Sequence, residues 1–197
     1  AADRYRTRKK TPQTPPQARR ITGTGCGLTR VAAQSHRACV ALGANIGEPL
    51  RQIDAGFSAL AALPGTRMIA RSSLYRSAPV GYADQPDFIN AVALIETTLA
   101  PQALLDALLG IEREHGRVRE FPNAPRTLDL DIVLYGDSAV QEPGLTIPHA
   151  RMLERAFVMV PLAEVAPDAA VPGHGRVRDL ATRVDAASVA QLQRLPA

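Results

Sequence analysis

Two aspartates, Asp129 and Asp131, are the residues of this sequence best suited to chemistry, because they lie two positions apart in an apolar run that extends from Thr127 to Tyr135. The run predicts a buried β-strand, in which alternate side chains leave on the same face. Asp129 and Asp131 therefore share a face, and the apolar residues between them point to the other. Two neighbouring carboxylates repel each other and resist burial, so they need positive charge beside them.

Two sources of positive charge fit this position. A divalent cation such as Mg²⁺ is typically held by one or two carboxylates together with phosphate oxygens of a substrate. Arg117, Arg119 and Arg126 lie just upstream and suit bidentate contacts with phosphate. The alternative is a salt-bridged strand end, with Asp129 and Asp131 paired to Arg126 and Arg119. The first interpretation predicts metal-assisted phosphoryl transfer, with the arginines on a loop over the site.

The elements that must position these residues follow from periodicity and from proline and glycine. We expect strands at 39–42, 68–75, 88–99 and 127–135, and helices at 50–60 and 101–111. After them come a short helix from Ala150, the segment Phe157–Val165, in which Pro161 should break or kink any helix, and a weak amphipathic helix near the C-terminus. The strand–helix–strand–strand–helix–strand order predicts an α+β fold, the ferredoxin-like βαββαβ sandwich, with helices packed on one face of an antiparallel sheet.

Charge is divided unevenly along the 197 residues. Residues 1–37 hold nine of the 23 Lys and Arg but only one acid, Asp3, which leaves 14 Arg against 18 Asp and Glu in the remainder. Residues 1–36 have the proline-rich, polar composition of a disordered basic tail, so 37–197 form the predicted single domain. Binding to nucleic acid is therefore expected of the tail at most, and not of the core.

Compartment and assembly follow from smaller signals. No apolar stretch is long enough to span a membrane, and the basic N-terminal region lacks the apolar core of a secretory signal. Cys26 and Cys39 are too few for a disulfide framework. A cytoplasmic protein is expected, and a monomer is the default assembly.

Four segments carry residues that packing alone does not require, and together they resemble the 6-hydroxymethyl-7,8-dihydropterin pyrophosphokinase family of the folate pathway. They are Leu42–Gly47, Ser77–Asn90, Gly116–Asp131 and Pro148–Phe157, and the third contains the specific sequence PRTLDLDI. The resemblance covers about Cys39 to Pro167. It implies a kinase-type transferase that moves pyrophosphate from ATP to the pterin hydroxymethyl group and releases AMP.

The resemblance also implies residue roles at the phosphate end of the site. Asp129 and Asp131 match the ligands of two Mg²⁺ ions, and Asp129 is our candidate to orient the hydroxyl proton. Arg117 and Arg126 match catalytic arginines that bind phosphate. The complete set implied for ATP is Leu105, Arg117, Arg126, Ile132, Thr146, His149 and Arg155.

A flat pterin ring needs aromatic faces and a polar partner at its edge. Phe88 and Phe157 match the two rings that sandwich the pterin in the family, and Asn90 matches the residue at its edge. Ser77, Pro79 and Val80 match the rim of the same pocket. Asn45 is expected to brace loops.

Some positions depart from the family pattern. Phe121–Pro125 has Asn-Ala where Trp-Gly is frequent, Ala44 replaces a common serine, Ala150 follows His149 where an aromatic residue sometimes occurs, and Gly144 stands at a possible basic position. These departures concern affinity more than chemistry. The Pro-rich loops Ser77–Asp87 and Glu120–Pro125 flank the predicted site, so we expect them to close over it.

Two other functions remain open from the residues alone. A pair of aspartates on such a sheet also suits nucleotidyl transfer with two metal ions, which would release pyrophosphate. A nucleic-acid-binding module driven by the basic tail would bind less tightly as salt is raised. The aromatic pair Phe88 and Phe157 favours the pterin substrate over the first, and the acidic core argues against the second.

Overall fold

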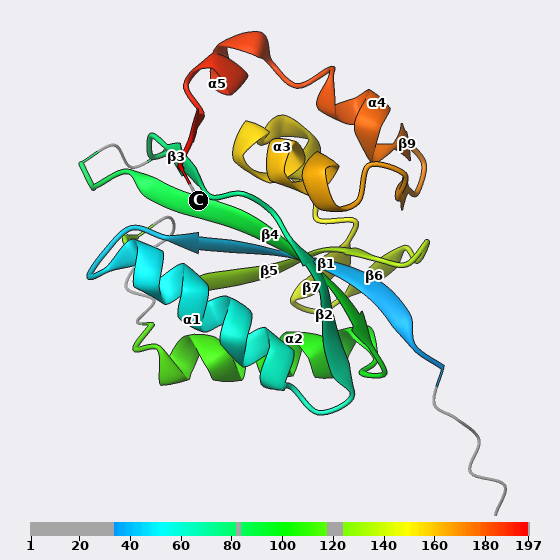
Figure 1. Ribbon diagram of the computed structural model, residues 1–197. Helices are drawn as coiled ribbons and strands as arrows, with labels where there is room; N and C mark the ends of the chain where they lie inside the picture. The colour runs from blue at the N-terminus through cyan, green and yellow to red at the C-terminus, as the bar shows by residue number, and fades with distance from the viewer. Residues whose placement is uncertain (1–33, 82–83, 118–123, 197) are drawn as a thin grey trace, which may run out of the picture. The chain divides into compact units, whose positions relative to one another are not determined.

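The computed structural model describes residues 34–81, 84–117 and 124–196, which belong to one compact unit spanning Ala33–Ala197. The sequence elements of the predicted sandwich all occur in it, in the predicted order (Figure 1). They are β1 (His36–Ala44), α1 (Pro49–Ala62), β2 (Thr66–Arg71), β3 (Tyr75–Ser77), β4 (Phe88–Thr97), α2 (Pro101–Glu114) and β5 (Asp129–Tyr135). Further along the chain are β6 (Val140–Glu142), β7 (Leu145–Ile147), η1 (Met152–Glu154), α3 (Ala156–Val165), β8 (Ala170–Val171), β9 (Gly175–Arg176), α4 (Val177–Ala181), α5 (Ala186–Ala190) and β10 (Gln193–Arg194).

The main sheet has the strand order β10-β3-β4-β1-β5, and β2 pairs with β4 beside β3. All of its pairings are antiparallel. β1 lies between β4 and β5, which places the end of β1 beside the start of β5, since Gly43 is opposite Asp129. The α+β class and the antiparallel sheet with packed helices are therefore confirmed.

Helices α1 and α2 cover one face of the sheet. Each begins with a proline in its first turn, where the missing N–H costs no helical hydrogen bond. Ile53 and Leu60 of α1, and Leu104 and Leu108 of α2, are fully buried in the core on this side. Gly56 allows α1 to approach closely, because a Cβ there would lie only 3.0 Å from Leu42 Cδ2.

The two helices of the predicted sandwich, α1 and α2, share one face as expected, and α3, which follows the sandwich, packs on the opposite face (Figure 1). Val92 and Leu94 of β4 face a second core that includes Met159 and Leu162 of α3. Ile95 and its alternating neighbours face α1 and α2 instead. A strand buried on both faces needs apolar residues at every position, as β4 has along most of its length.

Three local predictions needed correction. The strand expected at 68–75 is divided into β2 and β3, because the Ser72 hydroxyl accepts from the Val92 amide at 2.9 Å and interrupts the backbone ladder. The helix expected from Ala150 is the single 3₁₀ turn η1. Pro161 does not break α3, which continues to Val165 because its buried apolar residues hold it against the sheet despite one lost backbone donor.

The segment after α3 forms the hairpin of β8 and β9, then the short helices α4 and α5, and finally β10. β10 returns to the main sheet and pairs with β3. Among the described residues, no helix is long and apolar enough to cross a bilayer.

Candidate functional site

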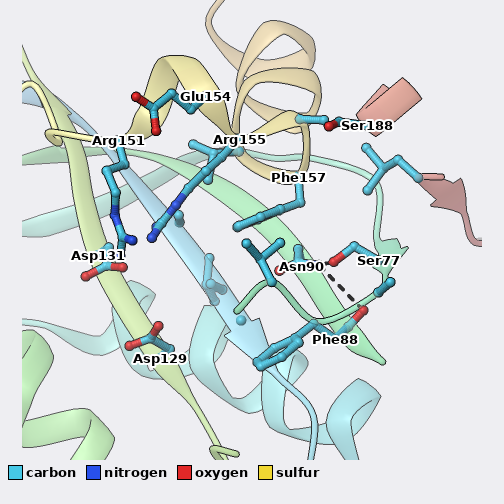
Figure 2. A pocket seen from close by; sticks show the side chains of 18 of the residues that line it. Ser77, Phe88, Asn90, Asp129, Asp131, Arg151, Glu154, Arg155, Phe157 and Ser188 are labelled. Atoms are coloured by element: carbon cyan, nitrogen blue, oxygen red, sulfur yellow. Dashed lines mark hydrogen bonds between the residues drawn. The ribbon is translucent and has the colours of Figure 1, made fainter. Parts of the chain in front are cut away.

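A cavity of about 460 Å³ opens where β1, β4 and β5 meet the segment that leads into α3 (Figure 2). Asp129 and Asp131 of β5 line it together with Phe88 of β4 and Phe157 of α3. Leu128, Leu130 and Ile132 lie in the core beneath α1 and α2. The prediction that the two aspartates share a face is therefore confirmed.

The two carboxylates have different partners. Asp129 forms ion pairs with Arg126, at 2.7 Å, and with Arg117. Asp131 is in no ion pair among the described residues, and burial raises its pKa, with the nearby charge of Asp129 adding to the effect. Half of the salt-bridge alternative therefore holds, for Asp129 alone, whereas Arg119, the partner suggested for Asp131, lies outside the described residues.

Glu112 of α2 fixes Arg117 from below. Glu112 is 2% exposed, and its carboxylate pairs with Arg117 and accepts a hydrogen bond from the Leu130 amide at 2.8 Å. Sequence analysis missed Glu112. The signal was a charged residue one helical turn after Leu108, on the inward face of α2.

Asn45, at the end of β1, joins two loops beside the cavity. Its side-chain oxygen accepts from the Arg126 amide at 2.8 Å, and its amide nitrogen donates to Gln85 Oε1 and the Pro86 carbonyl at 2.9 and 3.1 Å. The expected bracing role is confirmed. It fixes the backbone of Arg126, whose buried Nε has no partner within the described part of the chain.

A group of basic residues comes from the segment between β7 and α3. His149, Arg151 and Arg155 line the cavity, and Figure 2 shows the two arginine side chains extending towards Asp131. Burial lowers the pKa of His149, opposed by Asp131, and the positive charges of Arg155 and Arg151 lower it further. His149 Nδ1 accepts from the Arg151 amide at 3.3 Å, so the neutral ring carries its proton on Nε2.

Arg151 and Arg155 form no ion pair with another described residue, unlike Arg117 and Arg126. Burial lowers the pKa of Arg155, and the neighbouring charge of Arg151 adds to this. Arginines grouped in this way attract an anion with several oxygens. Arg151 and Glu154, which also lines the cavity, were not predicted, and nothing in their sequence context distinguishes them from ordinary surface residues.

The other end of the cavity contains the two aromatic rings. An arginine lies over each ring, with Arg126 Cζ 5.1 Å from the Phe88 centroid and Arg155 Cζ 5.6 Å from the Phe157 centroid. Asn90 is 5% exposed and donates to Ser77 Oγ at 2.9 Å, shown dashed in Figure 2. This end suits a flat ring with polar atoms at its edge.

Not every predicted residue reaches this cavity. Ser77 and Val80 line it, but Pro79 does not. Leu105 packs against the core below the sheet, Ile132 is part of that core, and Thr146 pairs with Gln141 in the hairpin of β6 and β7. Phe121, and parts of both loops expected to close, lie outside the described residues.

Asp129 and Asp131 alone provide too few ligands for a metal ion, so a substrate must supply the others. Within 34–81, 84–117 and 124–196, no three His, Cys, Asp or Glu side chains converge as a metal site. Asp129 and Asp131 offer carboxylate oxygens alone, which is the donor type that Mg²⁺ prefers, with the remaining ligands from water and phosphate. The pair therefore fits magnesium bound together with a polyphosphate.

Comparison with known proteins points to one family. The model of the 7,8-dihydro-6-hydroxymethylpterin-pyrophosphokinase family matches residues 39–167. A 2-amino-4-hydroxy-6-hydroxymethyldihydropteridine pyrophosphokinase of Pseudomonas aeruginosa is 54% identical over 136 residues, covering 69% of this chain and 84% of the relative. The Haemophilus influenzae protein of the same name is 48% identical over 143 residues, covering 73% and 89%.

A solved structure shares the fold at low identity. The crystal structure of a Plasmodium falciparum HPPK-DHPS triple mutant with pteroate aligns with a TM-score of 0.64 and 13% identity. The alignment covers 84% of this chain and 47% of that one, so this chain spans about half of its length.

Proposed function

Because this chain belongs to the 7,8-dihydro-6-hydroxymethylpterin-pyrophosphokinase family, it transfers pyrophosphate from ATP to 6-hydroxymethyl-7,8-dihydropterin in folate synthesis, and we propose that the cavity at the end of β5 is where it does so. The observation that supports this most directly is that Asp129 and Asp131 line one cavity with Phe88 and Phe157. A metal-binding pair and a ring-binding pair are what a phosphate donor and a pterin acceptor require side by side.

The charged end takes the triphosphate. Arg155 and His149 meet it as free donors, through the guanidinium group and Nε2–H. Arg117 and Arg126 are already held by Asp129, so they exchange carboxylate oxygens for phosphate oxygens as ATP binds. Leu105, Ile132 and Thr146 remain proposals for the adenine and ribose.

Asp129 and Asp131 hold Mg²⁺, for which we propose two ions, and the bound metal neutralises charge on the phosphate oxygens. Burial and mutual repulsion favour this role, because a cation relieves the repulsion between the two carboxylates.

Phe88 and Phe157 orient the pterin so that its hydroxymethyl oxygen faces the β-phosphorus. That oxygen forms a bond to the β-phosphorus, and the bond from the same phosphorus to the oxygen bridging to the α-phosphate breaks. AMP leaves with the bonding electrons. A carboxylate oxygen of Asp129 orients the hydroxyl proton, which passes to water. Asn90 contacts the ring edge, and Ser77, Pro79 and Val80 form the rim.

Product analysis tests the assignment. With ATP, Mg²⁺ and the reduced pterin alcohol together, we expect AMP and the pterin diphosphate, and no AMP when any one is omitted. Asp131→Ala should abolish the reaction, whereas Asp137→Ala, at an exposed position just beyond β5, should leave it unchanged. ADP as product would contradict the proposal, and pyrophosphate release would indicate nucleotidyl transfer.

A monomeric, cytoplasmic enzyme completes the proposal. The mass of a purified sample in solution tests the first part, and fractionation of cells tests the second.

A further inference from the structure

One wall of the cavity comes from outside the region that identifies the family. The family match ends at residue 167, but Ser188, Gln191 and Leu192 also line the cavity. Figure 2 shows Ser188 beyond Phe157, across the pocket from Asp129 and Asp131. This C-terminal wall, residues 188–192, has no role in the proposed mechanism so far.

The C-terminal wall is anchored on both sides. Before it, Asp185 caps α5 by accepting from the Ser188 amide at 2.8 Å, and α5 packs against α3, the helix that carries Phe157. After it, β10 pairs with β3, and the Leu195 amide donates to the Leu74 carbonyl at 2.9 Å. The wall therefore connects α3, the helix that carries Phe157, with β3, the strand that ends in Ser77.

A polar cluster strengthens the second anchor. Arg194 donates to Ser73 Oγ through Nη2 at 2.6 Å and lies 3.6 Å from Glu164 Oε1. Glu164 also accepts from the Tyr75 hydroxyl at 2.5 Å and the Ser73 amide at 2.7 Å. Because α3, β3 and β10 all contribute, the wall has a fixed position relative to the aromatic end of the cavity.

The side chains of the wall differ in what they offer a ligand. The Ser188 hydroxyl donates to Asp185 at 2.9 Å, so its hydrogen is already used. Gln191 is exposed and lines the cavity, and its side-chain amide has no hydrogen-bond partner in the described part of the chain, so donor and acceptor are both available to a ligand. Leu192 is half-buried and adds an apolar surface.

The surroundings indicate which part of the substrate meets this amide. The residues on the rim near Ser77 are Ala78, Val80 and Gly81, which carry no charge. The two cations nearest the rings, Arg126 and Arg155, lie over Phe88 and Phe157. A free amide on a wall without charged residues, in a cavity that also holds two aromatic rings, matches the polar edge of a neutral heterocycle better than a phosphate.

We propose that Gln191 is a specificity-determining residue that hydrogen-bonds a polar edge of the pterin ring, with Leu192 packed against the ring beside it. This inference rests on the proposed function, since it assigns a further contact to the pterin end of the same cavity.

Gln191→Ala tests it, with Gln193→Ala as the matched control, because Gln193 is exposed on β10 two residues away and outside the cavity. Losing one neutral hydrogen bond should raise KM for the pterin by roughly fivefold in Gln191→Ala. The KM for ATP and the melting temperature should match the wild type, and Gln193→Ala should match it in every measurement. Gln191→Glu, which keeps the size but adds charge, should also raise the pterin KM.

The outcomes separate the two claims. If the wild type forms AMP but Gln191→Ala keeps the wild-type KM for the pterin, the inference is overturned and the proposed function stands. An equal rise in the KM of both substrates would also overturn it, because a specific ring contact does not affect ATP. Wild-type protein that forms no AMP would contradict the proposed function itself.

Discussion

Asp129 and Asp131 occupy the same cavity in different electrostatic states. Asp129 is neutralised by two arginines, whereas Asp131 is half-buried and has no ion pair among the described residues. Desolvation and the charge of Asp129 raise the pKa of Asp131, so the folded protein disfavours the charged form of this carboxylate. The stability that its protonated form provides is lost as pH rises through the raised pKa. Without a bound cation, the charge of Asp131 therefore destabilises the folded protein, and binding of Mg²⁺ removes this cost.

Asp131→Asn should therefore stabilise the protein when no metal is present. We expect the free energy of unfolding in EDTA at pH 7 to rise by about 1 kcal/mol, because the substitution removes the repulsion of Asp131 by the charge of Asp129 and keeps the shape. Chemical denaturation measures this. With saturating Mg²⁺ and a non-hydrolysable ATP analogue the order should reverse, since only the wild type gains from binding. A less stable variant in EDTA would contradict the electrostatic argument.

Arg151 is the unpredicted cation of the phosphate end, and its exposed position limits what it contributes. Arg151→Ala should weaken binding of a non-hydrolysable ATP analogue by about threefold to fivefold, since an exposed charge contact contributes at most about 1 kcal/mol. Titration at two salt concentrations measures this, because the difference from wild type should shrink at high salt. Arg178→Ala, at an exposed position outside the cavity, is the control.

Residue-level prediction succeeded where a residue type is unusual for its element. Two acids in an apolar strand and an asparagine after a strand could be recognised from the sequence. Glu112 was missed because periodicity was used to find apolar positions, and its partners, Arg117 and Leu130, come from a later segment. Arg151 was missed because its position in the cavity depends on the 3₁₀ turn η1, which the sequence did not predict.

At the scale of elements, the anchoring of β10 depends on a titratable group. Burial raises the pKa of Glu164, but the hydrogen bonds from Tyr75 and Ser73 and the charge of Arg194 outweigh it, so the pKa is lowered from 4.5. A lowered pKa means that the anchoring is fully present above pH 4.5 and is lost as pH falls through the folded value.

Hydrogen exchange of the Leu195 amide, which donates to Leu74, follows this anchoring. We expect its protection to decrease as pH falls below 4.5, after correction for the intrinsic exchange rate. Glu164→Gln should show weaker protection at pH 6 and little dependence on pH, since it keeps an acceptor for Tyr75 and loses the charge for Arg194. A wild-type profile in this variant would exclude Glu164 as the anchor.

Helices and strands with a regular spacing of apolar residues were predicted well. Those whose conformation depends on tertiary packing were not. The spacing of Ile53, Phe57 and Leu60 defines α1, and Pro101 marks the start of α2. The break between β2 and β3 depends on a Ser72 hydroxyl that meets Val92 across the sheet. The helix through Pro161 depends on burial against a face of the sheet that the sequence order leaves unassigned.

At the scale of the whole molecule, charge separates the first 37 residues from the remainder. We expect a chain that begins at residue 34 to form AMP at the full-length rate, because the cavity is lined by residues of the described part of the chain, from Ala41 onward. Steady-state assays of the two chains test this. Binding to DNA that weakens with salt should be confined to the full-length chain. A large loss of activity in the shorter chain would show that the tail belongs to the catalytic unit.

The sandwich could be predicted as a whole, because the order of its elements permits few topologies. The second core, formed by α3 and the segments after it, could not, since short helices and two-residue strands leave little periodic signal. The segments that the sequence did not predict are therefore those that line the cavity beside Phe157.

The position of Ser188, Gln191 and Leu192 has a consequence for biosynthesis. A ribosome adds these residues after every other described residue that lines the cavity. The two aspartates and both phenylalanines therefore precede this last wall in the order of synthesis. Because the wall is proposed to contact the pterin and not ATP, we expect premature termination before Ser188 to weaken pterin binding more than nucleotide binding.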